Sequence, residues 1–258
     1  MRVVTEQKLK ADFEKFLSPG MRIVVHSSLS SLGFVEGGAE IVVKTLMKSI
    51  TRSGLIMMPA FTYGKEPYEP SATPCLTGII SETFRRTKDV KRSLHPTHSF
   101  CAWGNDAEFI LAGHDVVEPF KKDTPLDRFW RKGGYVVLLG VTHTANSLIH
   151  VAQELAEVPY LDRPKTVKVK NGTRLEDRIA RRAGCSLGFD KIASFISNDT
   201  AVRRYKVAEA NVLFMNAEIV LKNAVEILKE NPYILSCENP LCFACNEMKE
   251  FEKKREKE

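Results

Sequence analysis

A chain of 258 residues, 43% of them apolar, can bury a sizeable core and lies near the upper size limit of a single domain. Its net charge of +6 is a modest excess, and no helix-turn-helix, RNP or zinc-finger signature accompanies it, which argues against nucleic-acid binding. No apolar run is long enough to span a bilayer and the first residues lack the apolar core of a signal peptide, so we expect a cytoplasmic protein with no membrane partner.

Helical and strand patterns alternate along the chain. A helix is predicted over residues 6–17, where Ser18-Pro19-Gly20 ends the pattern. Short β-branched or apolar runs predict buried strands at residues 22–25, 55–58 and 135–139. Further helices are predicted over residues 41–50, 144–158, 189–197 and 217–228, and the mixed-charge end, residues 247–258, predicts a solvated helix or a frayed end. This alternation indicates one α/β domain over residues 1–258, a layered α/β/α sandwich with a mainly parallel or mixed sheet.

Polar residues follow the first predicted strand in the segment VVHSSLSSLGFVEGG. His26, Ser27 and Ser28 come directly after the strand, and Gly37-Gly38 introduce the next helix. Backbone amides and hydroxyls at such a position suit an anionic or carbonyl-bearing ligand. The segment has neither a GxGxxG nor a Walker sequence, and its serines can equally serve as helix caps.

The segment ANSLIHVAQELAEV predicts an amphipathic helix with chemistry on its polar face. The polar stripe consists of Asn146, His150, Gln153, Glu154 and Glu157. Because residues four apart lie above one another on a helix, Glu154 is predicted to contact His150, stabilise its cation and orient the ring. An imidazole with a pKa near neutrality suits removal of a proton from an attacking amine. An ordinary solvated helix face shows the same pattern.

Histidines elsewhere leave other reactions open. His95 and His98 stand three apart across a proline, where they can bind zinc or fix a turn through hydrogen bonds. A metal-dependent hydrolase could use these two with His143, His150 and an acid such as Asp115 or Glu154, although no ligand set lies on one element.

Cysteines give two further hypotheses. Cys101, near His98, could act as a thiol nucleophile, although Cys101 and Cys75 can equally be small buried apolar residues. Towards the C-terminus, Cys237, Cys242 and Cys245 have a C-x4-C-x2-C spacing around Pro240. In a cytoplasmic protein this spacing is typical of a metal knuckle at residues 237–245, with Cys185 as the candidate fourth ligand and structural zinc as the metal. Free thiols are the alternative, and nothing else indicates the iron–sulfur chemistry that also uses this spacing.

Five segments, taken together and in order, resemble the aminoglycoside 3-N-acetyltransferase family, also called the antibiotic N-acetyltransferase family. They are VVHSSLSSLGFVEGGAEIVVKTL, GLIMMPAFTYG, RSLHPTHSFCAWG, DTPLDRFWRKGGYVVLLGV and NSLIHVAQE, and they span residues 24–154, with weaker similarity over most of the remainder. The resemblance implies a single α/β domain and acetyl-CoA as co-substrate. It also implies direct transfer to an amine of an aminoglycoside or a related amino-sugar or amine metabolite, antibiotic resistance as a role, and no metal in the chemistry.

The same resemblance carries residue roles onto this sequence. His150 matches the catalytic histidine of the family's N-[ST]-x-x-H-x-x-E segment, which begins here at Asn146 and Ser147. The family's acidic position is Gln153 in this chain, so Glu154 is predicted to take the orienting role, unless the amine site is altered or the chain is an inactive CoA-binding homologue.

The donor and acceptor sites follow from the same match. The resemblance places the acetyl and pantetheine portion of CoA beside two segments, whose residues are His26, Ser27, Ser28, Leu29, Thr124 and Pro125. For a cationic acceptor the candidate carboxylates are Glu154, Glu157, Asp123 and Asp127.

Overall fold

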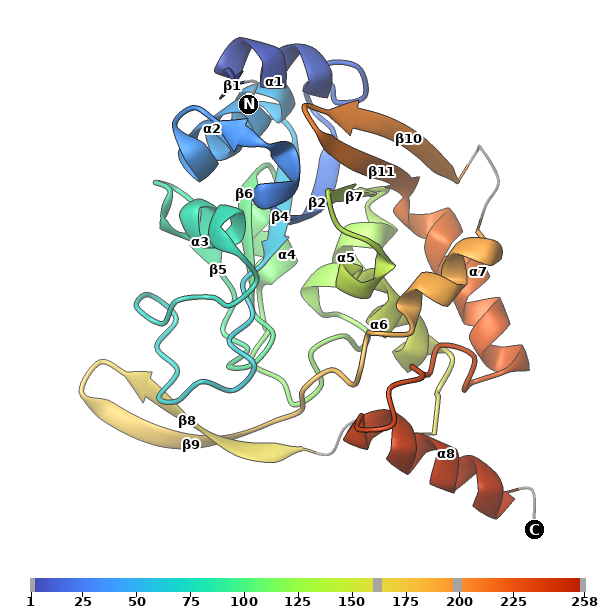
Figure 1. Ribbon diagram of the computed structural model, residues 1–258. Coiled ribbons are helices and arrows are strands. Elements are labelled where there is room, and N and C mark those ends of the chain that lie inside the picture. Colours follow the sequence, from blue (N-terminus) through green and yellow to red (C-terminus); the bar gives the residue numbers. More distant parts are fainter. Residues whose placement is uncertain (1–2, 160–163, 197–200, 256–258) are drawn as a thin grey trace.

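The computed structural model describes residues 3–159, 164–196 and 201–255 (Figure 1). Its main sheet has seven strands in the order β10-β11-β7-β2-β4-β6-β5. The bounds are β2 Arg22–Ser27, β4 Leu55–Pro59, β5 Lys91–Arg92, β6 Phe100–Gly104, β7 Tyr135–Leu139, β10 Val202–Val207 and β11 Ala210–Asn216. The three strands predicted from the sequence, β2, β4 and β7, run parallel at the centre, and antiparallel strands extend the sheet on both sides. The prediction of a mixed sheet is confirmed.

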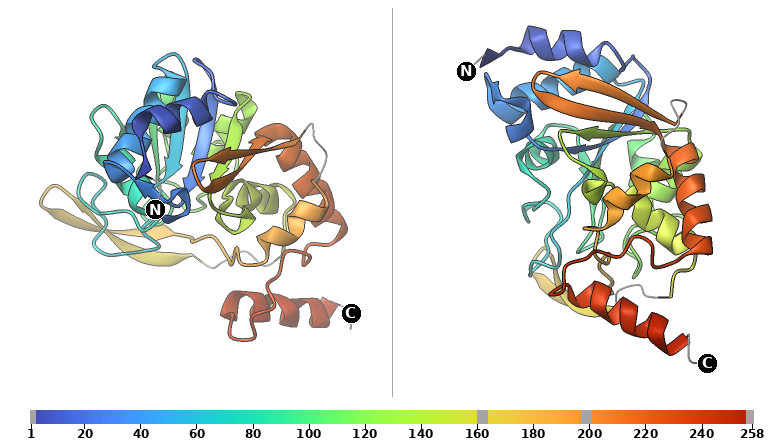
Figure 2. Two further views of the ribbon diagram at one scale, coloured as in Figure 1. Left: turned by 45° about the horizontal axis from the view of Figure 1, so that its top comes forward. Right: turned by 45° about the vertical axis from the view of Figure 1, so that its right-hand side comes forward.

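Helices cover both faces of this sheet, which makes the predicted three-layer sandwich (Figures 1 and 2). One face is covered by α1 Glu6–Phe13, α2 Gly38–Ile50 and α3 Ile79–Arg86. The other is covered by α4 Ala107–Leu111, α5 Pro125–Arg131, α6 Leu148–Leu155 and α7 Ala217–Glu230. Because successive strand residues point to opposite faces, Val24 packs in the α6 layer while Ile23 and Val25 pack under α2.

Smaller elements complete the chain. The short strands β1 Val3–Val4 and β3 Phe34–Val35 pair in parallel, and the 3₁₀ helices are η1 Ser30–Leu32, η2 His143–Ala145 and η3 Phe189–Ser194. A hairpin of β8 Lys165–Asn171 and β9 Arg174–Ala180, and the helix α8 Phe243–Arg255, lie away from the main sheet at the bottom of Figure 1. Within the described ranges, no helix combines the length and the apolar character that crossing a bilayer requires.

Two predicted helices differ from those in the structure. The helix expected over residues 144–158 is divided into η2 and α6, because the side-chain oxygen of Asn146 accepts the backbone N–H of Leu148 at 3.2 Å. The helix expected over residues 189–197 is the 3₁₀ helix η3, and Ser197 lies outside the described residues. The predicted charged end forms the greater part of α8, except for residues 256–258, which also lie outside them.

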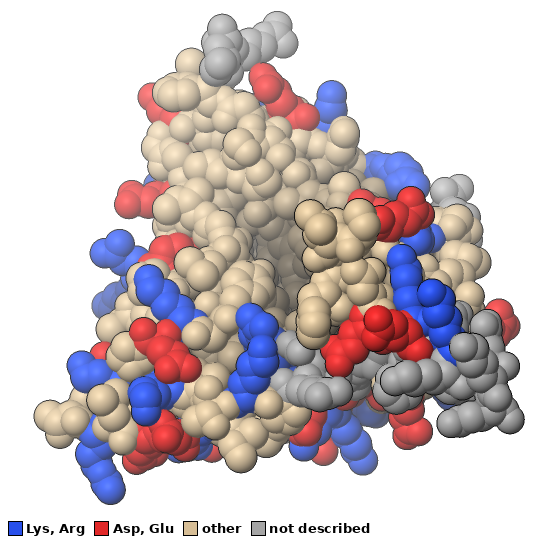
Figure 3. Space-filling model, turned by 60° about the horizontal axis from the view of Figure 1, so that its bottom comes forward, with Lys and Arg blue, Asp and Glu red and all other residues tan. Residues whose placement is uncertain are grey.

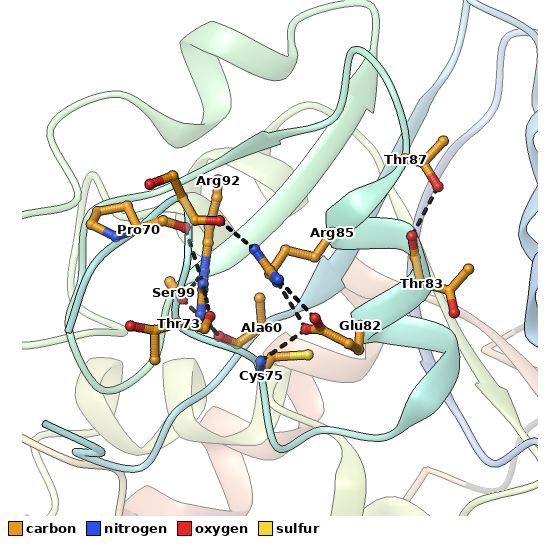
Figure 4. A network of polar contacts seen from close by, with 11 residues as sticks. Ala60, Pro70, Thr73, Cys75, Glu82, Thr83, Arg85, Thr87, Arg92 and Ser99 are labelled. Atoms are coloured by element: carbon orange, nitrogen blue, oxygen red, sulfur yellow. Dashed lines mark hydrogen bonds and ion pairs between the residues drawn. The ribbon is translucent and has the colours of Figure 1, made fainter. Parts of the chain in front are cut away.

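Two buried or half-buried arginines, Arg85 and Arg92, join neighbouring segments of the chain. Arg92 donates to four oxygens of neighbouring segments, those of Ala60, Pro70, Thr73 and Ser99 (Figure 4). Arg85, whose side chain is 8% exposed, pairs with Glu82 at 2.7 Å. These contacts fix the loop of residues 60–78, which joins β4 to α3. Both guanidiniums therefore bind protein groups.

Candidate active site

A cavity of about 480 Å³ opens at the carboxyl ends of β2 and β4. Its walls come from the ends of these strands, the loop after β4, His98 before β6, the η2–α6 segment, Lys165 of β8, residues 182–186 and the start of α8. Figure 3 shows a hollow on this face of the molecule, with mainly uncharged walls. Ligands of open α/β sheets bind at this edge, where strands end and loops supply polar groups. The cavity is therefore the candidate active site.

His150 lines this cavity from α6. Its side chain is largely buried, stacking on Phe120 at 5.1 Å and meeting the edge of Phe189 at 4.8 Å between ring centroids. Nδ1 donates to the amide oxygen of Gln153 at 2.8 Å. Because an amide oxygen can only accept, this bond places the proton on Nδ1 and leaves the lone pair on Nε2.

The pKa of His150 lies well below neutrality. Burial lowers it to about 4, the bond to Gln153 raises it, and the Arg181 guanidinium lowers it. The predicted pKa near neutrality is thus wrong, because the ring is desolvated by two phenyl rings and bonded to an amide instead of a carboxylate. The imidazole is neutral at pH 7 and can accept a proton at Nε2.

The predicted contact between Glu154 and His150 is also wrong. The carboxylate of Glu154 forms an ion pair with Arg181, which directly follows β9. Gln153, buried one position earlier, binds the imidazole in its place. Of the predicted polar stripe, Asn146 and His150 line the cavity, whereas Glu157 is exposed. Arg181 carries no sequence signal that would have shown its role.

Two polar atoms at the end of β2 have no hydrogen-bond partner among the described residues. They are Nε2 of His26 and Oγ of Ser27, both buried, and both residues line the cavity. Burial lowers the pKa of His26 to about 3, and the nearby His150 adds to this effect, so the ring of His26 is neutral. Buried polar groups are costly when unpaired, so these two atoms suit a polar group of a bound ligand.

A second hollow, of about 660 Å³, adjoins the cavity at Ser27. Ser28 and Leu29, which the resemblance assigns to the donor, line it together with Gly38 at the first turn of α2. Helix N-termini carry unpaired N–H groups that favour anions. We call this hollow the donor groove.

Thr124 and Pro125, the other predicted donor residues, line neither the cavity nor the donor groove. The hydroxyl of Thr124 donates to the carbonyl of Lys121 at 2.6 Å, and Pro125 is the buried first residue of α5. Both residues therefore begin a helix, and their contact with a donor stays a prediction.

The carboxylates proposed for a cationic acceptor have other positions. Asp127 is fully buried, and its carboxylate accepts from the side chains of Trp130 and Arg131, each at 3.0 Å, and from the backbone of Asp123. Glu154 pairs with Arg181. Asp123, Asp127, Glu154 and Glu157 do not line the cavity.

The histidines of the alternative hydrolase do not form a metal site. His95 accepts the backbone N–H groups of Thr97 and His98 at 3.3 and 3.1 Å, which is the turn-fixing role that the sequence left open. His143 and Asp115 do not line the cavity. In the parts of the chain that the structure describes, the residues close enough together to hold a metal ion are four cysteines, Cys185, Cys237, Cys242 and Cys245.

The cysteines divide into two kinds. Cys101 is fully buried in β6, and burial raises its pKa to about 12, so its thiol has neither the access nor the acidity of a nucleophile. Cys185, Cys237, Cys242 and Cys245 come together, with all sulfur atoms within 4.8 Å of one another. The structure thus confirms the predicted grouping, which can hold a metal ion.

Comparison with known proteins agrees with this geometry. The sequence model of the aminoglycoside 3-N-acetyltransferase family matches residues 24–229. The chain belongs to this family. A prophage-derived aminoglycoside N(3')-acetyltransferase-like protein of Bacillus subtilis, YokD, is 33% identical over 182 residues, 60% of this chain and 66% of the relative. Aminoglycoside N(3)-acetyltransferase IV of Salmonella is 35% identical over 147 residues, 56% of each chain. The chain therefore spans less than two thirds of the length of these curated relatives.

Solved structures of the family match over more of the chain. A crystal structure of the aminoglycoside acetyltransferase AAC(3)-IVa, a histidine-to-alanine variant in complex with a gentamicin, has a TM-score of 0.86 at 25% identity, covering 95% of this chain and 96% of that one. The crystal structure of YokD has a TM-score of 0.82 at 25% identity, covering 90% and 96%. These matches agree with the α/β sandwich and its seven-stranded mixed sheet.

Proposed function

We propose that this protein transfers the acetyl group of acetyl-CoA to a primary amine, with His150 as the general base. The observation that carries the proposal is the buried neutral imidazole, with Nδ1 bonded to Gln153 and Nε2 left to accept a proton beside the cavity. Family membership supports acetyl-CoA as the donor.

The donor groove supports the placement of the co-substrate. It meets the cavity at Ser27, so a donor lying along Ser28 and Leu29 would bring its thioester to the end of β2. A structure of a relative with the same fold, AAC-IIIb, contains CoASH. In our proposal the unpaired hydroxyl of Ser27 donates to the thioester oxygen, where negative charge develops during attack.

The proposed reaction needs no covalent enzyme intermediate. The amine nitrogen attacks the thioester carbonyl carbon, and its proton passes to Nε2 of His150 as the new C–N bond forms. The tetrahedral intermediate then collapses, the C–S bond breaks, and the CoA thiolate takes the proton from the imidazolium. The base thus ends in its starting state, and the products are the acetylated amine and CoA.

The cavity favours an acceptor of low positive charge. Structures of AAC(3)-IVa contain aminoglycosides, a gentamicin in one and apramycin in another. In this chain the described residues that line the cavity include the cations Lys165 and Arg182 and no carboxylate. A polycation would meet like charge there, so we propose an amino sugar or another amine metabolite with few amines as the acceptor, in place of an antibiotic.

The test measures thiol release from acetyl-CoA against a panel of amines, from aminoglycosides to amino sugars and amino acids. His150→Ala should lower turnover by roughly a hundredfold to ten-thousandfold, while CoA still raises the melting temperature.

The matched control is His143→Ala, since His143 is a buried histidine that does not line the cavity. This variant should keep turnover once its folding is verified. Wild-type turnover in H150A at pH 7 would exclude the proposed base. Binding of CoA without turnover on any amine would favour an inactive CoA-binding homologue.

A further inference from the structure

The four clustered cysteines, Cys185, Cys237, Cys242 and Cys245, are called here the cysteine cluster. Cys185 lies after β9, whereas the other three lie before α8 or in its first turn, so the cluster joins two distant parts of the chain. None of the four forms a disulfide, and their sulfur atoms lie within 4.8 Å of one another. Sulfur ligands of a tetrahedral zinc ion, with Zn–S bonds of about 2.3 Å, are separated by about 3.8 Å. The cluster is therefore close to the geometry of a four-thiolate site.

The backbone around the cluster is arranged as thiolate sites usually are. The N–H of Leu187 points to the sulfur of Cys185 at 3.4 Å, and that of Cys237 points to the sulfur of Cys245 at 3.3 Å. Such donors stabilise negative charge on sulfur and fix the ligand's orientation. The carbonyl of Asn239 accepts the N–H of Cys242 at 3.1 Å, which closes the turn between Cys237 and Cys242.

Apolar packing around the cluster is small. The local core contains only three buried residues within the described part of the chain, Cys237, Cys245 and Met248. Two of these three are themselves members of the cluster. The described side chains around the cluster therefore provide little hydrophobic burial to hold α8 in place. A bound metal would supply the missing cross-link.

The cluster also forms part of the cavity that contains His150. Cys185 and its neighbours Gly184 and Ser186 line this cavity. Phe243 and Ala244, which lie between two cluster cysteines, line it as well. Phe243 is 81% exposed, so packing does not fix its position.

We propose that the cysteine cluster binds one zinc ion, and that this ion positions the part of α8 that lines the cavity containing His150. Four protein thiolates complete a tetrahedral shell and leave no open position for a substrate or a water molecule, so the ion is structural. The zinc site stands on the cluster alone, whereas its effect on the acceptor rests on the proposed acetyl transfer.

The metal site is tested by metal analysis of protein purified from zinc-supplemented medium. We expect one zinc ion per chain, and Co²⁺ in its place should give the strong visible absorption of tetrahedral thiolate coordination. Cys185→Ser should lose the metal. Cys75→Ser is the matched control, because Cys75 is a buried cysteine outside the cluster, and it should keep the metal.

Two results would overturn the site. One is wild-type protein that binds neither zinc nor Co²⁺ after reduction. The other is protein whose mass shows cluster disulfides that remain when zinc is supplied. If Cys185→Ser fails to fold, chelation of the wild type and readdition of zinc give the same comparison, with protease cleavage before α8 as the readout.

The effect on the acceptor is tested by steady-state kinetics before and after chelation. Zinc removal should raise the KM for the amine on the order of ten- to hundredfold, because the cavity wall is displaced, while CoA affinity stays unchanged at the separate donor groove. Readdition of zinc should restore the KM. An unchanged amine KM in zinc-free protein overturns the coupling. If no amine is acetylated, acetyl transfer fails, but metal content and the Co²⁺ spectrum still decide the zinc site.

Discussion

Replacing Gln153 by Glu tests how the structure sets the basicity of His150. The amide oxygen of Gln153 lies 2.8 Å from Nδ1, and the side chain is 3% exposed. A carboxylate there adds a negative charge roughly 4 Å from the imidazolium, worth about 4 kcal/mol at an effective dielectric constant of about 20. The cost of burying that charge, and its competing attraction to Arg181, reduce the gain, so we expect a rise of about 1 to 3 pKa units. Starting from a pKa of about 4, the His150 pKa in Q153E should reach roughly 5 to 7.

The assay is an NMR titration of the ring C–H signals of His150, assigned by their loss in H150A. The wild type should show no midpoint for this ring between about pH 8 and 5. Q153E should show one, and the acidic limb of its pH–rate profile should move to higher pH by the same amount.

Glu154→Gln is the matched control, since it keeps the Nδ1 partner and removes the charge that neutralises Arg181. The His150 pKa should not rise in this variant. A midpoint in Q153E no higher than in the wild type, with a large shift in E154Q, would refute the assignment of Gln153 as the partner.

Two further predictions concern stability. Burial lowers the pKa of His26 to about 3 and the pKa values of His95 and His150 to about 4. As the pH falls below about 6.5, these histidines are therefore protonated in the unfolded chain but stay neutral in the folded protein, which favours unfolding. Each histidine should cost up to about 2 kcal/mol of stability at pH 5, and a melting temperature that stays constant from pH 8 to 5 contradicts this. Burial raises the pKa of Asp12, but hydrogen bonds from two neighbouring lysines outweigh it and lower the pKa to about 2. Asp12→Asn should therefore reduce the free energy of unfolding at pH 7 by about 1–2 kcal/mol, discounted because both lysines are half-exposed, and equal urea midpoints would count against it.

Local patterns were sufficient to predict the centre of the fold. The apolar runs of β2, β4 and β7 and the periodicity of α2 depend on neighbouring residues, so they can be read along the chain. The hairpins β8–β9 and β10–β11 were not predicted. Strands β8 and β9 are largely exposed and have no apolar run that would mark them. The pairing of β11 with β7 joins residues far apart in sequence, which no local pattern reports.

The candidate site shows the same division. The sequence by itself determined that His150 lies on a helix with a polar stripe, and that Ser27 and Ser28 follow a strand. Only the tertiary structure decided between Gln153 and Glu154 as the partner of His150, because residues three and four apart are both neighbours on a helix. Arg181, from the end of a hairpin absent from the prediction, pairs with Glu154 and leaves the imidazole to the amide. Helical periodicity determines which side chains share a face, but the packing of distant segments decides which charged groups contact that face.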